Sequence, residues 1–306
     1  MDTLSVVVAH SDSPAPETGP VSKTVTALEQ IRRMRGGSQA HLMRCSDQAY
    51  YVVKFQNNPQ HRRILANEFL AAKLAEQLGL PTTPVAIVNV SEDLIRWTED
   101  LAIELPRRRV PCGAGLQFGS RYPGDPRHVA AFEFLPDENL RRVTNLSDFL
   151  GMLVFDKWTC NTDGRQTIFL QERTPRRRRA YDSLPRPYRA VMIDQGFCFN
   201  AGEWNFPDAP LRGLYTRNRV YESVTGMESF GPWIERLETN VTEETFAEII
   251  AQLPPEWYED DYDALTRLCE QLLARRRRIP TLIKEVRGSN RQPFPNWFQD
   301  AIYLGR

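Results

Sequence analysis

Two motifs early in the chain carry residue types that bind phosphate groups. The turn Gly36-Gly37-Ser38-Gln39 offers successive backbone N–H groups, which at a glycine turn can cradle phosphate oxygens. Lys54 lies in the apolar stretch from Ala49 to Phe55, and Glu68 follows on the next predicted helix. An ammonium group held by such a carboxylate is positioned to contact nucleotide phosphates. The plainer alternatives are an ordinary turn and a lysine that faces solvent from an edge strand.

Two acidic residues in the middle of the chain complete the pattern. Asp163 lies in the polar loop from Asn161 to Gln166, where an acid can orient or deprotonate a hydroxyl. Asp194 ends the apolar stretch from Val191 to Ile193 and places a carboxylate where it can bind Mg²⁺. Taken singly, each is also what an ordinary loop or strand end contains. In chain order, the four motifs together predict a phosphotransferase that uses ATP and Mg²⁺.

The elements around the first two motifs are predicted to be strands and one helix. Ala49 to Phe55 is rich in β-branched and aromatic residues, which is typical of a strand. Arg63 to Leu78 is predicted to be a helix, because its leucines recur four residues apart and Gly79 and Pro81 follow as a stop. Val85 to Val90 is predicted to be another strand.

The rest of the chain is predicted to be mainly helical around one small hairpin. Residues 98–128 are predicted to be loop-like, and Val129 to Leu135 an apolar strand. Apolar spacing predicts an amphipathic helix over residues 146–153. Thr167 to Gln171 and Ala190 to Ile193 are predicted to be short strands on either side of a basic insert. One helix is predicted to begin after Thr242, its N-cap. A last helix is predicted to include residues 265–273. The fold class is therefore α+β.

These motifs resemble those of the HipA-like kinase family, whose fold is related to that of protein kinases and phosphatidylinositol kinases. The resemblance covers roughly Val25 to Glu203. Five segments carry it: Gly37-Ser38-Gln39-Ala40-His41, Tyr51-Val52-Val53-Lys54-Phe55, Asn67-Glu68, the stretch from Phe155 to Asp163, and Ile193-Asp194-Gln195-Gly196-Phe197. It implies a bilobal protein-kinase-like fold, with a small N-lobe of sheet plus helix and a mainly helical C-lobe. The nucleotide would lie between the two lobes.

The resemblance also implies roles for the residues expected at the nucleotide. Lys54 would contact the α- and β-phosphates and pair with Glu68. Ser38 and Gln39 would lie in the turn that covers the phosphates. The hinge would run from Glu133 through Phe134 to Leu135 and offer backbone groups to adenine.

The catalytic and metal positions follow the family pattern with one departure. Asp163 would orient or deprotonate the acceptor hydroxyl, and Asp194 would hold Mg²⁺. Kinase-like enzymes usually carry a metal-binding Asn five residues after the catalytic Asp, and Ile168 stands there instead. Gln166 is the nearest amide that can substitute. The departure keeps open a pseudokinase, which binds nucleotide without turnover and acts as a regulatory or partner-binding module.

The chain divides into three predicted regions. Residues 1–20 combine Pro, Ser, Gly and acidic side chains, a composition that buries little apolar surface and predicts a flexible leader. The N-lobe is expected over residues 21–135 and the C-lobe over residues 136–306.

Composition narrows the remaining function classes. The chain has 306 residues with 39 basic and 39 acidic side chains, so zero net charge makes nucleic-acid binding unlikely as a bulk electrostatic effect. The run Arg176 to Arg179 is expected to be a solvated insert, or alternatively to attract an acidic substrate. No apolar run approaches the roughly 20 residues of a membrane span. Five scattered cysteines without a paired spacing favour the reducing cytoplasm.

The acceptor is expected to be a hydroxyl: protein Ser/Thr first, by family analogy, with lipid headgroups and small metabolites left open.

Overall fold

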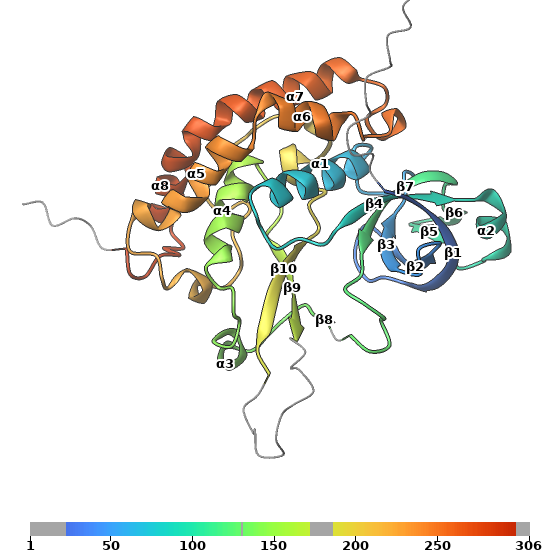
Figure 1. The fold of residues 1–306 in the computed structure, drawn as a ribbon, viewed down its shortest axis with the longest axis horizontal. Coiled ribbons are helices and arrows are strands. Elements are labelled where there is room, and N and C mark those ends of the chain that lie inside the picture. Colours follow the sequence, from blue (N-terminus) through green and yellow to red (C-terminus); the bar gives the residue numbers. More distant parts are fainter. Residues whose placement is uncertain (1–22, 130, 172–185, 298–306) are drawn as a thin grey trace, which may run out of the picture.

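The computed structural model describes residues 23–129, 131–171 and 186–297. The expected leader over residues 1–20 and the run Arg176 to Arg179 lie outside the described residues. Helices and strands are mixed, as the α+β prediction requires. Figure 1 shows the strands of the first third of the chain gathered at one side, and the long helices of the last third at the other.

Five strands close into a small barrel. They are β1 (Thr24–Arg33), β2 (His41–Cys45), β3 (Tyr50–Lys54), β7 (Gly115–Arg121) and β4 (Val85–Val90), paired in that order. β1 and β4 pair in parallel and close the ring, while the other neighbours are antiparallel. Because side chains alternate along a strand, Tyr51 and Val53 fill the barrel while Val52 and Lys54 face outward.

The prediction of a loop over residues 98–128 is wrong. Helix α2 (Glu92–Trp97) and the hairpin of β5 (Ala102–Leu105) and β6 (Arg108–Pro111) lie at one end of the barrel (Figure 1), and β7 follows. Glycine in β7 serves packing here: a Cβ at Gly119 would collide with the side chain of Val88 on β4. At Gly119, a glycine within the stretch expected to be a loop therefore reflects close packing between strands.

Helix α1 (Ile64–Gln77) joins the barrel to the helical part of the molecule. It contacts β4 and β7 on one side, and helix α6 and two 3₁₀ turns on the other. Eleven of its 14 residues are buried, including the polar Asn67 and Glu68. A helix that is buried on nearly every face has no solvent side, which is why two polar residues in it need partners inside the protein.

A three-stranded antiparallel sheet lies below α1 in Figure 1, in the order β10 (Tyr188–Ile193), β9 (Gln166–Gln171), β8 (Ala131–Phe132). The two predicted hairpin strands are confirmed, each slightly longer than expected, with Gln166 opposite Ile193. The predicted strand from Val129 to Leu135 is reduced to the two residues of β8, and Leu135 instead packs into the core.

The helical part is built around α4 (Asp148–Trp158), which is buried from Phe149 to Trp158. Around it lie α5 (Gly231–Asn240), α6 (Glu243–Ile250), α7 (Tyr262–Arg275) and α8 (Ile279–Arg287), with the short α3 (Asp137–Leu140) apart from them (Figure 1). The predicted N-cap is confirmed: Thr242 Oγ1 accepts from the N–H of Thr245 at 3.3 Å. The five 3₁₀ segments in the described residues are Cys198–Glu203, Asn218–Tyr221, Met227–Phe230, Pro255–Tyr258 and Arg276–Arg278.

Two further observations concern membrane-spanning helices and the cysteines. Within the described residues, no helix combines the length and apolar character needed to cross a membrane. All five cysteines fall in described segments, and all are free and buried.

Candidate active site

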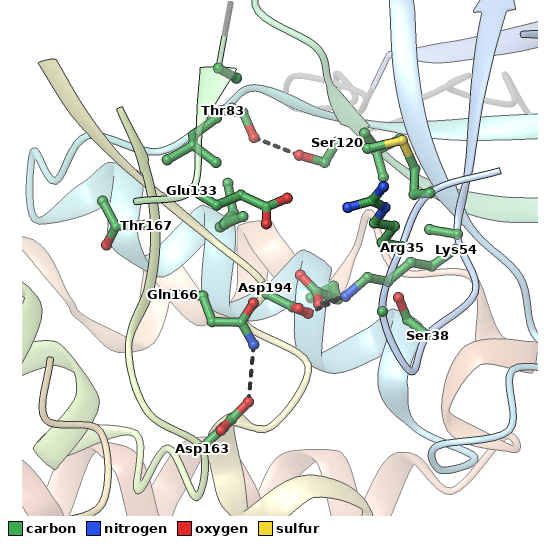
Figure 2. Close-up of a pocket in the computed structure, with 18 of the residues that line it drawn as sticks. Arg35, Ser38, Lys54, Thr83, Ser120, Glu133, Asp163, Gln166, Thr167 and Asp194 are labelled. Atoms are coloured by element: carbon green, nitrogen blue, oxygen red, sulfur yellow. Dashed lines mark hydrogen bonds and ion pairs between the residues drawn. The ribbon is translucent and has the colours of Figure 1, made fainter. Parts of the chain in front are cut away.

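A pocket of about 1110 Å³ lies between the outer face of the barrel, helix α1 and the β8–β10 sheet. Figure 2 shows how its side chains converge from these separate elements. The predicted site residues that line it are Ser38, Lys54, Glu68, Glu133, Phe134, Asp163, Gln166 and Asp194. The fold therefore collects into one cavity residues that are spread over more than 150 positions of sequence.

Lys54, Glu68 and Asp194 form a charge cluster at the back of this pocket. The Lys54 ammonium contacts Oε1 of Glu68 and Oδ1 of Asp194 (Figure 2), and the three side chains are 8%, 3% and 27% exposed. Burial alone would lower the pKa of Lys54, but the charges of Glu68 and Asp194 raise it above its ordinary value. Burial likewise opposes ionisation of Asp194, yet the Lys54 charge holds the pKa of that carboxyl below its usual range. Lys54 therefore stays protonated beside an ionised Asp194.

Glu68 also fixes the backbone that follows Asp194. Its two carboxylate oxygens accept from the N–H groups of Gln195 at 3.1 Å and Gly196 at 2.8 Å. A side chain at position 196 has no room, because a Cβ there would lie 2.7 Å from Ile64 Cγ1. Asp194 itself adopts φ 62°, a left-handed conformation that Asp tolerates better than most residues. The Asp-x-Gly pattern is thus explained by close approach to α1.

Asn67, whose role the sequence did not reveal, reinforces the same attachment. Its amide Nδ2 donates to the carbonyls of Gly196, Cys198 and Ala201 at 2.9, 2.9 and 2.7 Å, and its Oδ1 accepts from Trp204 Nε1 at 2.8 Å. One buried side chain on α1 therefore provides hydrogen-bond donors to three backbone carbonyls in the segment after β10. Only the residue pair Asn67-Glu68 in the sequence hinted at it.

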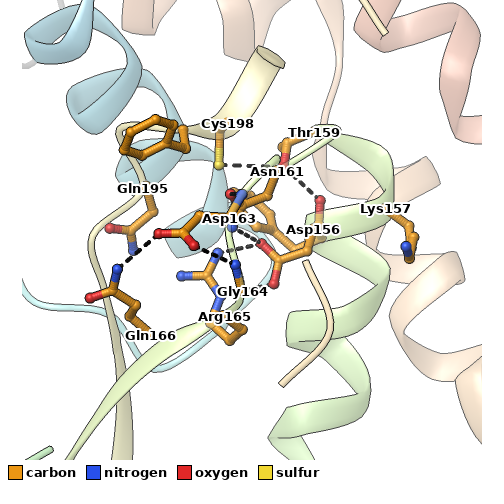
Figure 3. Close-up of polar contacts among 12 residues, drawn as sticks. Asp156, Lys157, Thr159, Asn161, Asp163, Gly164, Arg165, Gln166, Gln195 and Cys198 are labelled. Atoms are coloured by element: carbon orange, nitrogen blue, oxygen red, sulfur yellow. Dashed lines mark hydrogen bonds and ion pairs between the residues drawn. The ribbon is translucent and has the colours of Figure 1, made fainter. Parts of the chain in front are cut away.

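The loop that carries Asp163 is held in place by a buried ion pair. Asp156, on the last turns of α4, pairs with Arg165, whose Nε donates at 2.8 Å and whose Nη1 reaches the carbonyl of Ile193 at 3.1 Å (Figure 3). Asn161 donates to Asp156 at 2.9 Å and accepts from the N–H of Asp163 at 3.1 Å. The Asp163 loop is thereby tied both to α4 and to the end of β10, which precedes Asp194.

Gln166 lines the same pocket as Asp163, the predicted catalytic residue, and Asp194, the predicted metal ligand (Figure 2). Its Nε2 donates to Asp163 Oδ2 at 3.1 Å, and the N–H of Gly164 donates to Asp163 Oδ1 at 2.7 Å. Ile168, two residues further along β9, also lines the pocket and offers no ligand atom. Among the described residues, no group of three or more His, Cys, Asp or Glu side chains could hold a metal ion. Asp194 and Gln166 nevertheless provide the oxygen donors that Mg²⁺ prefers, and Mg²⁺ commonly binds through one or two carboxylates plus substrate phosphates.

Gln39 is the predicted site residue that the structure does not bring to the pocket. Its side chain bonds the backbone of Glu104 on β5, donating at 2.8 Å and accepting at 2.7 Å. The turn that precedes it does border the cavity, with Gly36 at φ 116°, a conformation that favours glycine. Ser38 is buried there, and its carbonyl accepts from Asn58 Nδ2 at 2.8 Å. Gln39 thus anchors the turn to the β5–β6 hairpin.

The predicted hinge follows β8 along the opposite wall. Glu133 and Phe134 line the pocket, and the Arg217 guanidinium lies 4.9 Å from the Phe134 ring centre. Leu135 is not among the residues that line the cavity, and its carbonyl accepts a hydrogen bond from Arg217. Above them, the hydroxyls of Thr83 and Ser120 bond each other at 2.6 Å (Figure 2).

Similarity to known proteins bears on the same residues. Residues 28–170 match the HipA-like kinase family. No curated protein matches the sequence. Similar solved structures include a Golgi casein kinase with Mn/ADP bound, at 12% identity over 88% of this chain and 74% of that one, with a TM-score of 0.45. The proinflammatory kinase CtkA of Helicobacter pylori has 13% identity over 87% and 98%, with a TM-score of 0.44.

A third similar structure is HipA of Shewanella oneidensis MR-1, from a toxin–antitoxin complex with HipB and operator DNA. It has 16% identity over 86% of this chain and 69% of that one, with a TM-score of 0.44. Two of these three structures are described as kinases, and no conclusion about this chain follows from such low identities and TM-scores. The family match reaches from the first barrel strand through Asp163 and Ile168, and so includes three of the four motifs. Residues 28–170 thus match the HipA-like kinase family, and over these residues the resemblance indicated by the motifs is confirmed.

Proposed function

We propose that the protein is a kinase that transfers the γ-phosphoryl group of ATP to a hydroxyl acceptor in the presence of Mg²⁺. The observation that carries this proposal is the contact of Lys54 with both Glu68 and Asp194 in a pocket that also holds Asp163 and Gln166. An N-lobe over residues 21–135 and a C-lobe over residues 136–306 would provide the two sides of that pocket. Glu133 and Phe134 would border the base, and Ser38 the phosphates.

Asp163 is suited to receive the acceptor proton. Each of its carboxylate oxygens accepts one hydrogen bond, from Gly164 and from Gln166, which leaves lone pairs free on an exposed side chain. As the acceptor oxygen attacks the γ-phosphorus, its proton passes to Asp163 and the new O–P bond forms. The bond from the γ-phosphorus to the β,γ-bridging oxygen breaks, and that oxygen keeps the electron pair and leaves as ADP.

The protein's own part in this transfer is mainly positioning. Asp194 and Gln166 would hold Mg²⁺, which, when bound, neutralises charge on the phosphates. Lys54 would hold the α- and β-phosphates, while Glu68 fixes Lys54 and the turn after Asp194. Protein Ser/Thr is the first acceptor class to test, by family analogy, and the cytoplasm the expected compartment.

Ile168 favours a second candidate function. With an aliphatic side chain where kinases carry a metal-binding Asn, a pseudokinase would bind nucleotide, transfer nothing and act on a partner protein. Gln166 is the residue that separates the two candidates, because it is the nearest amide that could replace the missing ligand.

The test compares thermal unfolding and phosphate release in wild type and Asp194→Asn. ATP with Mg²⁺ should raise the wild-type Tm, because a ligand that binds only the native state stabilises it. The shift should shrink in Asp194→Asn, and wild type alone should release phosphate. A shift without any turnover across acceptor classes favours the pseudokinase. If neither ATP nor ATP with Mg²⁺ shifts the wild-type Tm, both candidates fail.

A further inference from the structure

Two of the cations that line the pocket, Lys54 and Arg165, are already paired with carboxylates. Lys54 contacts both Glu68 and Asp194, so its charge is balanced within that cluster. Arg165 also lines the pocket, but its guanidinium is committed to Asp156 and to the carbonyl of Ile193. A nucleotide triphosphate brings several negative charges to this place. A further cation on the pocket wall would therefore change its affinity substantially.

Three arginines other than Arg165 line the pocket, Arg32, Arg35 and Arg121, and Arg35 is the one next to the glycine turn that is expected to cover the phosphates. It stands between Met34 and Gly36, and its guanidinium extends into the pocket from the barrel side, on the same wall as Lys54 (Figure 2). Within the described ranges it has neither an ion pair nor a side-chain hydrogen bond, whereas Arg33, two residues earlier, contacts Gln39 and Glu104. Arg35 is therefore free to bind a ligand.

The backbone around Arg35 is held at several points, while the position next to it is open. The N–H of Met34 donates to the carbonyl of Ala40 at 2.8 Å, and the side chain of Gln39 bonds the backbone of Glu104. Nothing lies within 4 Å of a Cβ placed on Gly36. Arg35 therefore stands beside open space on a turn whose ends are fixed.

We propose that Arg35 is a catalytic residue that contacts the γ-phosphoryl oxygens of the bound nucleotide; this rests on the proposed function. Arginine stays charged at any physiological pH, and its planar fork donates two parallel hydrogen bonds to phosphate oxygens. In phosphoryl transfer, charge spreads over the three equatorial oxygens of the moving group, where a guanidinium stabilises it. Lys54 serves the α- and β-phosphates, and Arg35 serves the group that is transferred.

The test measures the affinities of ADP and of the non-hydrolysable analogue β,γ-imido-ATP, each with Mg²⁺, by calorimetry. Arg35→Gln should weaken binding of the analogue by about tenfold or more, the worth of a charge-assisted hydrogen bond, and leave ADP binding unchanged. Lys54→Met should weaken both. Arg108→Gln, an equal charge change on the exposed strand β6 outside the pocket, should alter neither. Arg35→Lys should restore part of the loss.

Each result has one meaning for the proposal. Selective loss of analogue binding, with an unchanged Tm of the free protein, supports it. Equal loss of ADP and analogue binding, or no loss of either, overturns the assignment while leaving the proposed function intact. If wild type binds neither nucleotide, the proposed function fails and the Arg35 assignment fails with it. In the active enzyme, Arg35→Gln should lower kcat as well, which a purely structural role would not do without lowering the Tm.

Discussion

The buried pair of Asp156 and Arg165 allows a sharp prediction about the base of the active site. Their side chains are 0% and 1% exposed, so replacing Asp156 by Asn leaves a guanidinium in the interior without its counter-charge. Burial would lower the pKa of Arg165, but the Asp156 charge raises it, so the guanidinium remains charged. Breaking one side of a buried ion pair costs about 3–5 kcal/mol. That is a large part of the roughly 5–15 kcal/mol that stabilises a typical domain.

Asp156→Asn should therefore lose about 3–5 kcal/mol of unfolding free energy. The assay is guanidinium chloride denaturation followed by tryptophan fluorescence, read as a lower midpoint at an unchanged slope. Turnover should fall too, because Asn161 donates to Asp156 and also fixes the backbone of Asp163. Asp93→Asn is the matched control, since its partner Arg96 is 63% exposed and Asp93 itself 76%.

A loss below about 1 kcal/mol in Asp156→Asn would refute this reasoning, because it would mean that Arg165 finds solvent or another partner. The double variant Asp156→Leu/Arg165→Met provides the complementary check. Replacing both charges by apolar groups of similar volume should recover most of the stability. It should not recover turnover, because Asn161 and the carbonyl of Ile193 lose their partners.

Two further predictions concern other parts of the fold. His41 is buried in the barrel, where burial lowers its pKa to about 4. Below pH 6.5 the unfolded chain therefore binds a proton at His41 that the native state does not bind. The free energy of unfolding should fall by up to about 3 kcal/mol as the pH drops from 6.5 to 4. Denaturation curves of His41→Gln should lack this contribution. Gly196→Ala should cost about 1–3 kcal/mol and weaken the ATP-induced Tm shift, because its Cβ would meet Ile64 and Glu68; Gly231→Ala, with no atom within 4 Å, should do neither. A Gly196→Ala protein as stable as Gly231→Ala would show that α1 and the turn can separate freely.

Local sequence patterns were sufficient to predict the elements that carry the central contacts. The β-branched and aromatic composition of β3 and the leucine stripe of α1 were both visible in the sequence, and the structure joins Lys54 to Glu68 as expected. The hairpin before Asp194 was predictable for the same reason, since its strands are apolar and short. The roles of these residues in binding and catalysis stay predictions.

Features that depend on distant partners were not predictable. Closure of the barrel needs β1 beside β4, and glycine in β7 looked like a loop because the neighbouring Val88 is far away in sequence. Gln39 looked like a ligand of phosphate because its partner Glu104 lies on a hairpin that the sequence did not indicate. The functions of Asn67 and Arg165 as internal hydrogen-bond donors likewise depend on carbonyls more than 25 residues away.

Asp163 is the group proposed to receive the acceptor proton, and a loss of turnover with nucleotide binding intact tests this role most directly. The measurement is Mg²⁺-dependent ADP formation from ATP by wild type and Asp163→Ala, with the ATP-induced Tm shift recorded for both. We predict that Asp163→Ala keeps the shift, because the Lys54–Glu68–Asp194 cluster is untouched, while its turnover falls by about 10²-fold or more. Wild-type turnover in Asp163→Ala would contradict the account.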